Sequence, residues 1–274
     1  MKYFTVTQYE THGIGSIVQF HYICNALANE MGGKFVFNTL KNVGGLKVHN
    51  QTNNTNISIE EWDKSLNDFF NFVKLEKTLP IKHVNNLNEI EGEEIVFNIS
   101  FKCLLEYYAK NVEKIHEREF IYSIKDNFVY NERSYFDDSL KNICWHIRVP
   151  LIEDQPNNVV KPKRRLGIAK QEEDIKAIKN ELQKRFGNDI CLNIISNGKE
   201  DDFNKITNEF SWAKKINLKL NDHVINDLYH MSFCDGLIMA NSSYSWCCHL
   251  INKNLTLANR LFYCTLHKPL VYVS

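Results

Sequence analysis

The spacing of apolar side chains along the chain predicts strands and helices in alternation. Residues 2–8 alternate polar with aromatic or β-branched side chains, which is typical of a strand. The next apolar residues recur at steps of three or four and predict a helix, which the glycine pair at 32–33 ends before a strand at 34–38. The chain therefore opens with a β-α-β unit.

The rest of the pattern continues in the same way. Helices are expected at about 62–73, 104–115 and 175–186, and strands at 94–98, 143–149, 190–196, 215–220, 236–240 and 269–273. Strands that alternate with helices predict an α/β fold built on parallel sheets. A polar stretch at 131–142 marks the expected boundary between two lobes, residues 1–141 and 142–274.

Composition narrows the classes of partner. Lys plus Arg equals Asp plus Glu at 33 each among 274 residues, so the charge balance does not favour a nucleic acid or an anionic membrane. The first residues are too polar for a signal peptide, and no run approaches the ~18 apolar residues of a membrane span. The eight cysteines have no regular spacing and are expected to be reduced thiols. We therefore expect a cytoplasmic protein.

The segment 221–252 predicts a helix, a buried strand, a tight turn and a second helix. The second helix begins in Asn241-Ser242-Ser243, three residues of the type that caps helices. Their hydroxyls and the backbone N–H groups of the helix start suit a phosphate or another anion. The alternative is an ordinary capped helix, which on spacing alone is the more frequent case.

Two further patterns suggest a ligand. His146 and Arg148 share one face at the end of the strand at 143–149, where open α/β sheets bind ligands and where an arginine suits a phosphate. The alternative for Arg148 is an ion pair between the lobes. Gly13-x-Gly15 follows the first strand, but Val18 stands where the full dinucleotide fingerprint needs a glycine, so a simple turn is at least as good an interpretation.

Zinc is a competing interpretation of the C-terminal cysteines and histidines. The available ligands do not have the paired spacing of structural zinc sites, because neighbouring residues on a helix point to different sides. They are Cys247, Cys248, His249, Cys264 and His267. We expect no zinc site.

Two sequence runs resemble the α-1,2-fucosyltransferase family. The chain has Asp227-Leu228-Tyr229-His230-Met231-Ser232-Phe233-Cys234 and Ile238-Met239-Ala240-Asn241-Ser242-Ser243-Tyr244-Ser245-Trp246. The family writes these as D-L-x-x-M-S-x-C and I-I-A-N-S-S-F-S-W-W-G. The chain departs from the family at 247–249, where Cys-Cys-His replaces Trp, Gly and a small residue.

Two shorter matches extend the resemblance. His146-Ile147-Arg148 reproduces the first half of the family's H-x-R-R-G-D, whereas Val149-Pro150-Leu151 replaces the second half. Lys163-Arg164-Arg165 would compensate for the missing arginine, although such a cluster is more often solvated surface. The turn at Gly13-Ile14-Gly15-Ser16-Ile17 stands where the family has G-L-G-N-Q.

The resemblance implies a GT-B glycosyltransferase with two Rossmann-like lobes facing across a cleft. It implies an inverting transfer of L-fucose from GDP-fucose to a glycan hydroxyl, with Arg148 neutralising the leaving diphosphate and His146 shaping the site. Glu10 or His12 is the candidate base. The expected donor-binding residues are Gly13, Gly15, Arg148, Ser196, Asn241, Ser242, Ser243 and Ser245.

No metal or other cofactor is expected beside the GDP-sugar co-substrate. The pair Asp201-Asp202 is the alternative metal site, but it is not the D-x-D of metal-dependent transferases. Two other functions stay open: a non-catalytic module that binds a nucleotide-sugar or a glycan, and a transferase that uses another GDP-deoxyhexose. In each case the partners are small molecules and glycans, without nucleic acid.

Overall fold

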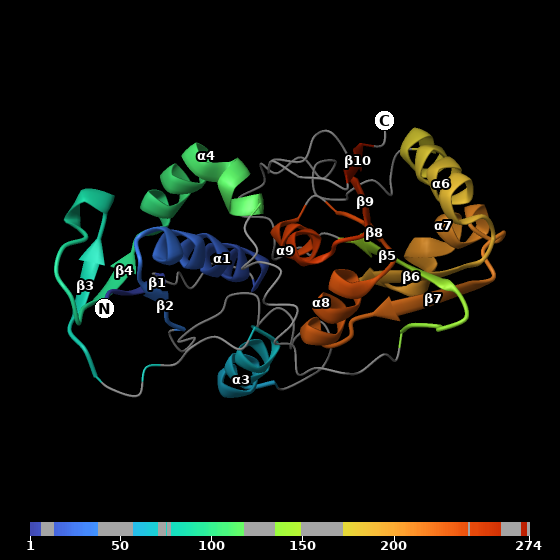
Figure 1. Ribbon diagram of the computed structural model, residues 1–274. Helices are drawn as coiled ribbons and strands as arrows, with labels where there is room; N and C mark the ends of the chain where they lie inside the picture. The colour runs from blue at the N-terminus through green and yellow to red at the C-terminus, as the bar shows by residue number, and fades with distance from the viewer. Residues whose placement is uncertain are drawn as a thin grey trace, which may run out of the picture. The chain divides into compact units, whose positions relative to one another are not determined.

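The chain folds into two units that each contain one parallel sheet and helices (Figure 1). The computed structural model describes residues 1–6, 14–37, 57–70, 75, 78–117, 135–148, 172–240, 242–258 and 270–272. The first unit is Met1–Asn50 with Thr55–Tyr130, and the second is Gln51–Asn54 with Asn131–Ser274. The expected α/β class with two parallel-sheet lobes is confirmed.

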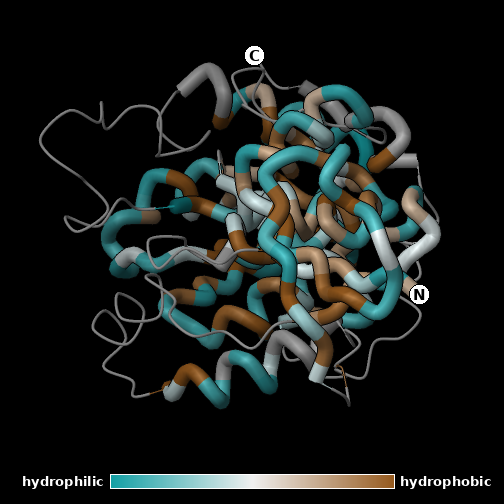
Figure 2. The backbone as a smooth tube through the Cα atoms, turned by 90° about the vertical axis from the view of Figure 1, so that its left-hand side faces the viewer, coloured by the Kyte–Doolittle hydropathy of each residue, from teal (hydrophilic) through white to brown (hydrophobic). Residues whose placement is uncertain are grey.

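The sheet of the first unit has the order β2-β1-β4-β3, and every neighbouring pair is parallel. Its strands are β1 (Tyr3–Val6), β2 (Lys34–Phe35), β3 (Ile81–Val84) and β4 (Val96–Ile99). The helices are α1 (Ile14–Glu30), α3 (Ile59–Phe70) and α4 (Phe101–Glu117), with a 3-10 turn at Leu87–Glu89. Figure 2 shows hydrophobic and hydrophilic stretches alternating along the coiled parts of the chain, which is the pattern that predicted helices.

Two predictions for this unit need correction. The strand expected at 94–98 begins at Val96, because Glu94 has a left-handed φ of 56° and its N–H donates to the carbonyl of Met1 at 3.0 Å. Strand β3 was not predicted at all. Only Val84 of its four residues is buried, and Ile81 is 62% exposed, so this edge strand has no alternating hydrophobic pattern.

The second unit contains a six-stranded sheet of order β10-β9-β8-β5-β6-β7, also parallel throughout. The strands are β5 (Lys141–Ile147), β6 (Ile190–Ser196), β7 (Lys215–Leu220), β8 (Gly236–Ile238), β9 (Leu255–Ala258) and β10 (Leu270–Tyr272). The helices are α6 (Glu172–Phe186), α7 (Asn204–Glu209), α8 (Val224–Phe233) and α9 (Ser243–Ile251), with a 3-10 turn at Glu200–Phe203. The predicted bounds of β6 and β7 are confirmed. Strand β9 and helix α7 were not predicted, because each is too short to show a period.

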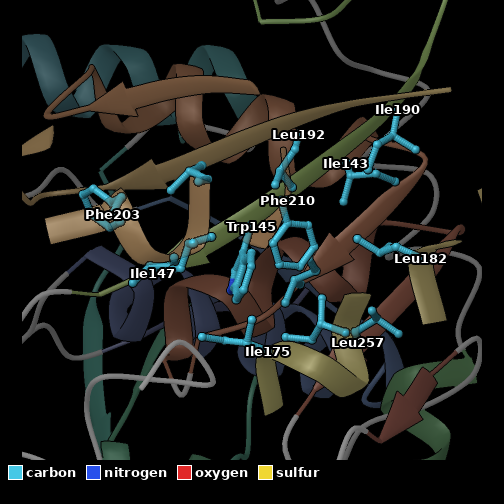
Figure 3. Close-up of a cluster of buried hydrophobic side chains, with 14 of the residues drawn as sticks. Ile143, Trp145, Ile147, Ile175, Leu182, Ile190, Leu192, Phe203, Phe210 and Leu257 are labelled. Atoms are coloured by element: carbon cyan, nitrogen blue, oxygen red, sulfur yellow. The ribbon is translucent and has the colours of Figure 1, made fainter. Parts of the chain in front are cut away.

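Successive residues of β5 face opposite sides of this sheet. Ile143, Trp145 and Ile147 pack with α6 and α7 in a buried hydrophobic cluster, in which the rings of Trp145 and Phe210 meet edge to face at 5.3 Å (Figure 3). Cys144 lies on the other side, where its thiol contacts the carbonyl of His230 in α8 at 3.5 Å. The sheet is therefore covered on both faces, and β5 after Lys141 and all of β6 are buried.

Within the described ranges, no helix is both long enough and apolar enough to cross a membrane.

Candidate functional site

The candidate site lies where the strand order of the second unit reverses. The chain passes from β5 to β6 and β7 on one side and then returns to β8 on the other side of β5. Strands β5 and β8 pair in parallel, with Trp145 opposite Ile238, so their carboxyl ends lie side by side. Open α/β sheets bind ligands in the crevice at such a reversal. The residues that the sequence singled out at 146–148 and 240–245 follow these two strand ends.

Helix α9 begins as predicted, but Ser242 acts as its cap. The Ser242 side-chain oxygen accepts a hydrogen bond from the N–H of Tyr244 at 3.2 Å, and the Ser242 N–H donates to the carbonyl of Ala240 at 2.8 Å. Ser242 is 5% exposed. Two N–H groups that were expected to meet an anion therefore already have partners within the turn. Ser243, which is half-buried, is the first residue of the helix and the better placed of the two serines for a ligand.

His146 and Ser245 form the central contact of the site. Nδ1 of His146 and the hydroxyl of Ser245 are hydrogen-bonded, although 99 residues separate them in the chain. The same hydroxyl oxygen accepts the N–H of Ala240 at 3.2 Å. The ring of Tyr244 meets the imidazole edge to face at 5.5 Å, and its own hydroxyl donates to the carbonyl of Val224 in α8. Strand β5, the end of β8, and helices α8 and α9 are thus joined around one imidazole.

The imidazole of His146 is neutral at physiological pH. Burial, and after it the positive charge of Arg148, lowers the pKa of His146 to about 3. Arg148 is the first residue after β5 and is half-buried. Among the described residues, an anion bound here would meet the permanent positive charge of Arg148 and hydrogen-bond donors that carry no charge.

Ser196 lies on the neighbouring strand but on the other face. It pairs with Ile147 in the register of β5 and β6, and it follows Leu192 and Ile194 in the alternation that faces α6 and α7. Its hydroxyl is buried and has no hydrogen-bond partner among the described residues, which is uncommon in native proteins. The structure therefore does not group Ser196 with His146 and Ser245.

The remaining predicted residues fall into two groups. Gly15 lies in the first turn of α1, in the first unit, and is buried. Five single residues and one basic cluster lie outside the described residues, namely Glu10, His12, Gly13, Asn241, Cys264 and Lys163–Arg165. His267, proposed as a zinc ligand, also lies outside them.

The alternative metal site at Asp201-Asp202 has a structural role. Asp202 accepts the N–H of Lys199 at 2.8 Å and so caps the 3-10 turn at Glu200–Phe203. Asp201 accepts from the side-chain amide of Asn204 at 3.4 Å. Within the described residues, no group of three or more His, Cys, Asp or Glu side chains is arranged to hold a metal ion.

Cys247, Cys248 and His249, which differ from the fucosyltransferase motif, lie in the core of the second unit. Cys247 and Cys248 are both 0% exposed, and the Cys248 thiol contacts the carbonyl of Leu228 in α8 at 3.9 Å. His249 is also buried, with Nδ1 3.0 Å from the hydroxyl of Thr256. These residues therefore affect the site through the packing of α9 against its neighbours.

Sequence reasoning missed a partly buried polar cluster beside this site. The hydroxyl of Tyr135 donates to Oδ2 of Asp222 at 2.5 Å and lies 3.1 Å from Oδ1 of Asp227, while its ring stacks on His230 at 3.8 Å. The ammonium of Lys219 lies 4.5 Å from the centre of the same ring. Tyr135 falls in the polar stretch that was assigned to the lobe boundary, so its only signal was the aromatic pair Tyr135-Phe136 among mostly polar residues.

The two carboxyl groups of this cluster have opposite pKa shifts. Burial, and then the nearby charge of Asp222, raises the pKa of Asp227 well above its usual value. Burial acts in the same direction on Asp222, but hydrogen bonds from Tyr135, the N–H of His223 and the amide of Asn226 outweigh it and lower the pKa of Asp222. When the pair holds a single proton, that proton is therefore on Asp227.

Comparison with known proteins gives no family assignment. No protein-family model matches the sequence, and no characterised protein is similar to it in sequence at a significant level. Among solved structures, POFUT1 in complex with GDP-fucose aligns with a TM-score of 0.47 and 10% identity, over 100% of this chain and 97% of that one. UDP-GlcNAc 2-epimerase from Neisseria meningitidis, bound to UDP-GlcNAc, aligns with a TM-score of 0.35 and 11% identity, over 98% and 84%. Similarity at this level assigns neither a family nor an activity.

Proposed function

We propose that this chain is an inverting glycosyltransferase of the two-lobed GT-B type that transfers L-fucose from GDP-fucose to a hydroxyl of a glycan. One observation carries the proposal. Arg148, the neutral His146 and the start of α9 meet at the reversal of the strand order, and all three belong to the runs that resemble the fucosyltransferase motifs. Charge, neutral donors and position together suit a nucleoside diphosphate.

The reaction needs charge stabilisation on one side and proton removal on the other. The acceptor oxygen forms a bond to the anomeric carbon of fucose while the bond from that carbon to the diphosphate oxygen breaks, and GDP leaves with the electron pair. Arg148 offsets the negative charge that grows on the leaving diphosphate. His146 contributes a hydrogen bond and no charge, because its pKa is about 3. The acceptor's proton goes to a base, for which Glu10 and His12 in the first unit are the candidates.

The donor is proposed to bind without a metal ion. Of the carboxylates that would hold one, Asp202 caps a turn through the N–H of Lys199 and Asp201 accepts from the amide of Asn204. Arg148 and the donors at the start of α9 take the place of the metal in meeting the diphosphate. The protein is proposed to act in the cytoplasm on small-molecule and glycan substrates.

A second candidate, a non-catalytic module, is favoured by the loss of the family's second arginine. Val149-Pro150-Leu151 replaces Arg-Gly-Asp, so binding without transfer is a coherent alternative. A third candidate uses another GDP-deoxyhexose. The residues that differ after Trp246 are buried in the core, so they would change the sugar preference through the position of α9.

Thermal stabilisation followed by GDP release separates these functions. A ligand that binds only the folded state raises the melting temperature, so GDP and GDP-fucose should raise it, while UDP-GlcNAc should not. Release of GDP from GDP-fucose in the presence of a glycan acceptor supports the transferase. Stabilisation by GDP without release over a panel of acceptors identifies the module, and preferential stabilisation by GDP-rhamnose identifies a different donor. The absence of stabilisation by any guanine nucleotide would refute the proposed site.

A further inference from the structure

We propose that Ser245 is a positioning residue that fixes the tautomer of His146, so that the imidazole presents an Nε2–H donor to an oxygen of the bound nucleotide-sugar. The assignment of the ligand rests on the proposed function. The tautomer itself is a property of the free protein and is tested without any ligand.

The hydrogen-bond balance of the Ser245 hydroxyl favours one arrangement. Its oxygen accepts the N–H of Ala240 at 3.2 Å and is bonded to Nδ1 of His146. Ser245 is 0% exposed, so its hydroxyl is closed to bulk solvent. If Nδ1 carried the proton, the oxygen would accept two N–H groups and its own proton would have no acceptor among the described residues. A buried hydroxyl proton without an acceptor costs about 1–3 kcal/mol.

The opposite arrangement gives a partner to the Ala240 N–H, to the Ser245 hydroxyl and to Nδ1 of His146. The Ala240 N–H donates to the Ser245 oxygen, and the Ser245 hydroxyl donates to Nδ1. Nδ1 is then an acceptor, and the single proton of the neutral ring is on Nε2. Nε2 of His146 has no hydrogen-bond partner in the described part of the chain, although the residue is only 9% exposed. A ring nitrogen that has no protein partner is open to a hydrogen bond with a ligand.

The surroundings keep the ring in place and uncharged. The ring of Tyr244 meets it edge to face at 5.5 Å, and the Tyr244 hydroxyl is held by the carbonyl of Val224. Burial and the charge of Arg148 keep the pKa of His146 at about 3. The family has Phe at the position of Tyr244, so the hydroxyl that attaches this ring to α8 is a feature of this chain. Arg148 then supplies charge to the ligand, and His146 supplies a directed, uncharged donor.

Nitrogen NMR of histidine tests the tautomer directly. In protein labelled with ¹⁵N-histidine, the His146 signals are assigned by their loss in His146→Gln. The wild-type protein should show a one-bond N–H coupling on Nε2 and none on Nδ1, unchanged between about pH 5 and pH 8 because the pKa is about 3. Ser245→Ala should keep the ring neutral, since burial and Arg148 remain, but should populate the tautomer with the proton on Nδ1.

A matched variant and a binding measurement complete the test. Ser232→Ala removes another buried serine hydroxyl, from α8, and should leave the His146 spectrum unchanged. By titration calorimetry, Ser245→Ala should bind GDP-fucose roughly fivefold more weakly, as expected for one impaired hydrogen bond. A wild-type coupling on Nδ1, or an unchanged tautomer in Ser245→Ala, overturns the inference. If the tautomer is as stated but GDP-fucose does not bind the wild type, the proposed function fails and the role of Ser245 in setting the tautomer stands.

Discussion

Replacing Arg148 by alanine is expected to abolish transfer while leaving the protein folded. Arg148 is the one permanent positive charge that the described residues place beside His146 at the end of β5. A unit charge about 4 Å from a developing negative charge contributes roughly 4 kcal/mol at an effective dielectric constant near 20, which suits a half-buried group. Loss of one donor to a developing oxyanion costs a similar ~3–4 kcal/mol. The chemical step should therefore slow by about a hundred- to thousandfold.

Two companion variants make the result specific. Arg148→Lys should restore little, because an ammonium does not present the planar two-donor fork of a guanidinium. Arg185→Ala removes a surface arginine of α6, paired with Glu181, and should leave the rate unchanged. Arg148→Ala should also raise the pKa of His146, because the charge of Arg148 is one cause of its low value, although burial remains the larger cause.

The assay measures the melting temperature and the single-turnover rate on the same samples. If Arg148 only pairs with a carboxylate, its loss lowers the melting temperature and leaves the rate per folded molecule intact. A folded Arg148→Ala protein with near-normal transfer would refute both the mechanism and the resemblance on which it rests.

Three further predictions follow from the same site. Transfer should survive EDTA, and an absolute requirement for Mn²⁺ or Mg²⁺ would relocate the diphosphate to Asp201–Asp202. Ser243→Ala should weaken GDP binding, measured by calorimetry, more than Glu10→Ala, since the donor is assigned to the second unit; the reverse ranking at unchanged fold would overturn that assignment. Asp227→Asn should gain stability relative to the wild type in thermal melts as the pH rises above about 4, the pKa of an unfolded aspartate. The raised pKa of Asp227 makes a contribution to folding stability that is complete below the unfolded pKa and is lost as the pH rises through the folded pKa. The lowered pKa of Asp222 makes a contribution with the opposite dependence, which is present above the unfolded pKa and is lost as the pH falls. A melting-temperature difference that does not change with pH would contradict the raised pKa of Asp227.

The local spacing of apolar and capping residues was enough to predict most of the helices and strands, including most strands of the second sheet. Strands β6 and β7 have the bounds that the pattern predicted. β6 is a mostly apolar run because it is buried along its whole length, and the edge strand β7 alternates polar with apolar residues, so each shows its pattern without knowledge of its partners. The capping residue Ser242 likewise marked the start of α9, since the cap is a contact between residues only two apart. Strand β3 was invisible because a mostly exposed edge strand has no hydrophobic period.

Only the tertiary structure decided which of these elements form the site. The bond between His146 and Ser245 joins residues 99 apart, and the bonds of Tyr135 to Asp222 and Asp227 join residues 87 and 92 apart. The sequence suggested Ser196 as a donor-binding residue, but the alternation of β6 turns its side chain to the opposite face of the sheet. The local spacing of apolar residues indicates which residues form a strand and which side chains share a face of it, because both depend on neighbours in the chain. The order of the parallel strands depends on long crossover connections, and it is this order that brings the ends of β5 and β8 together around one neutral imidazole.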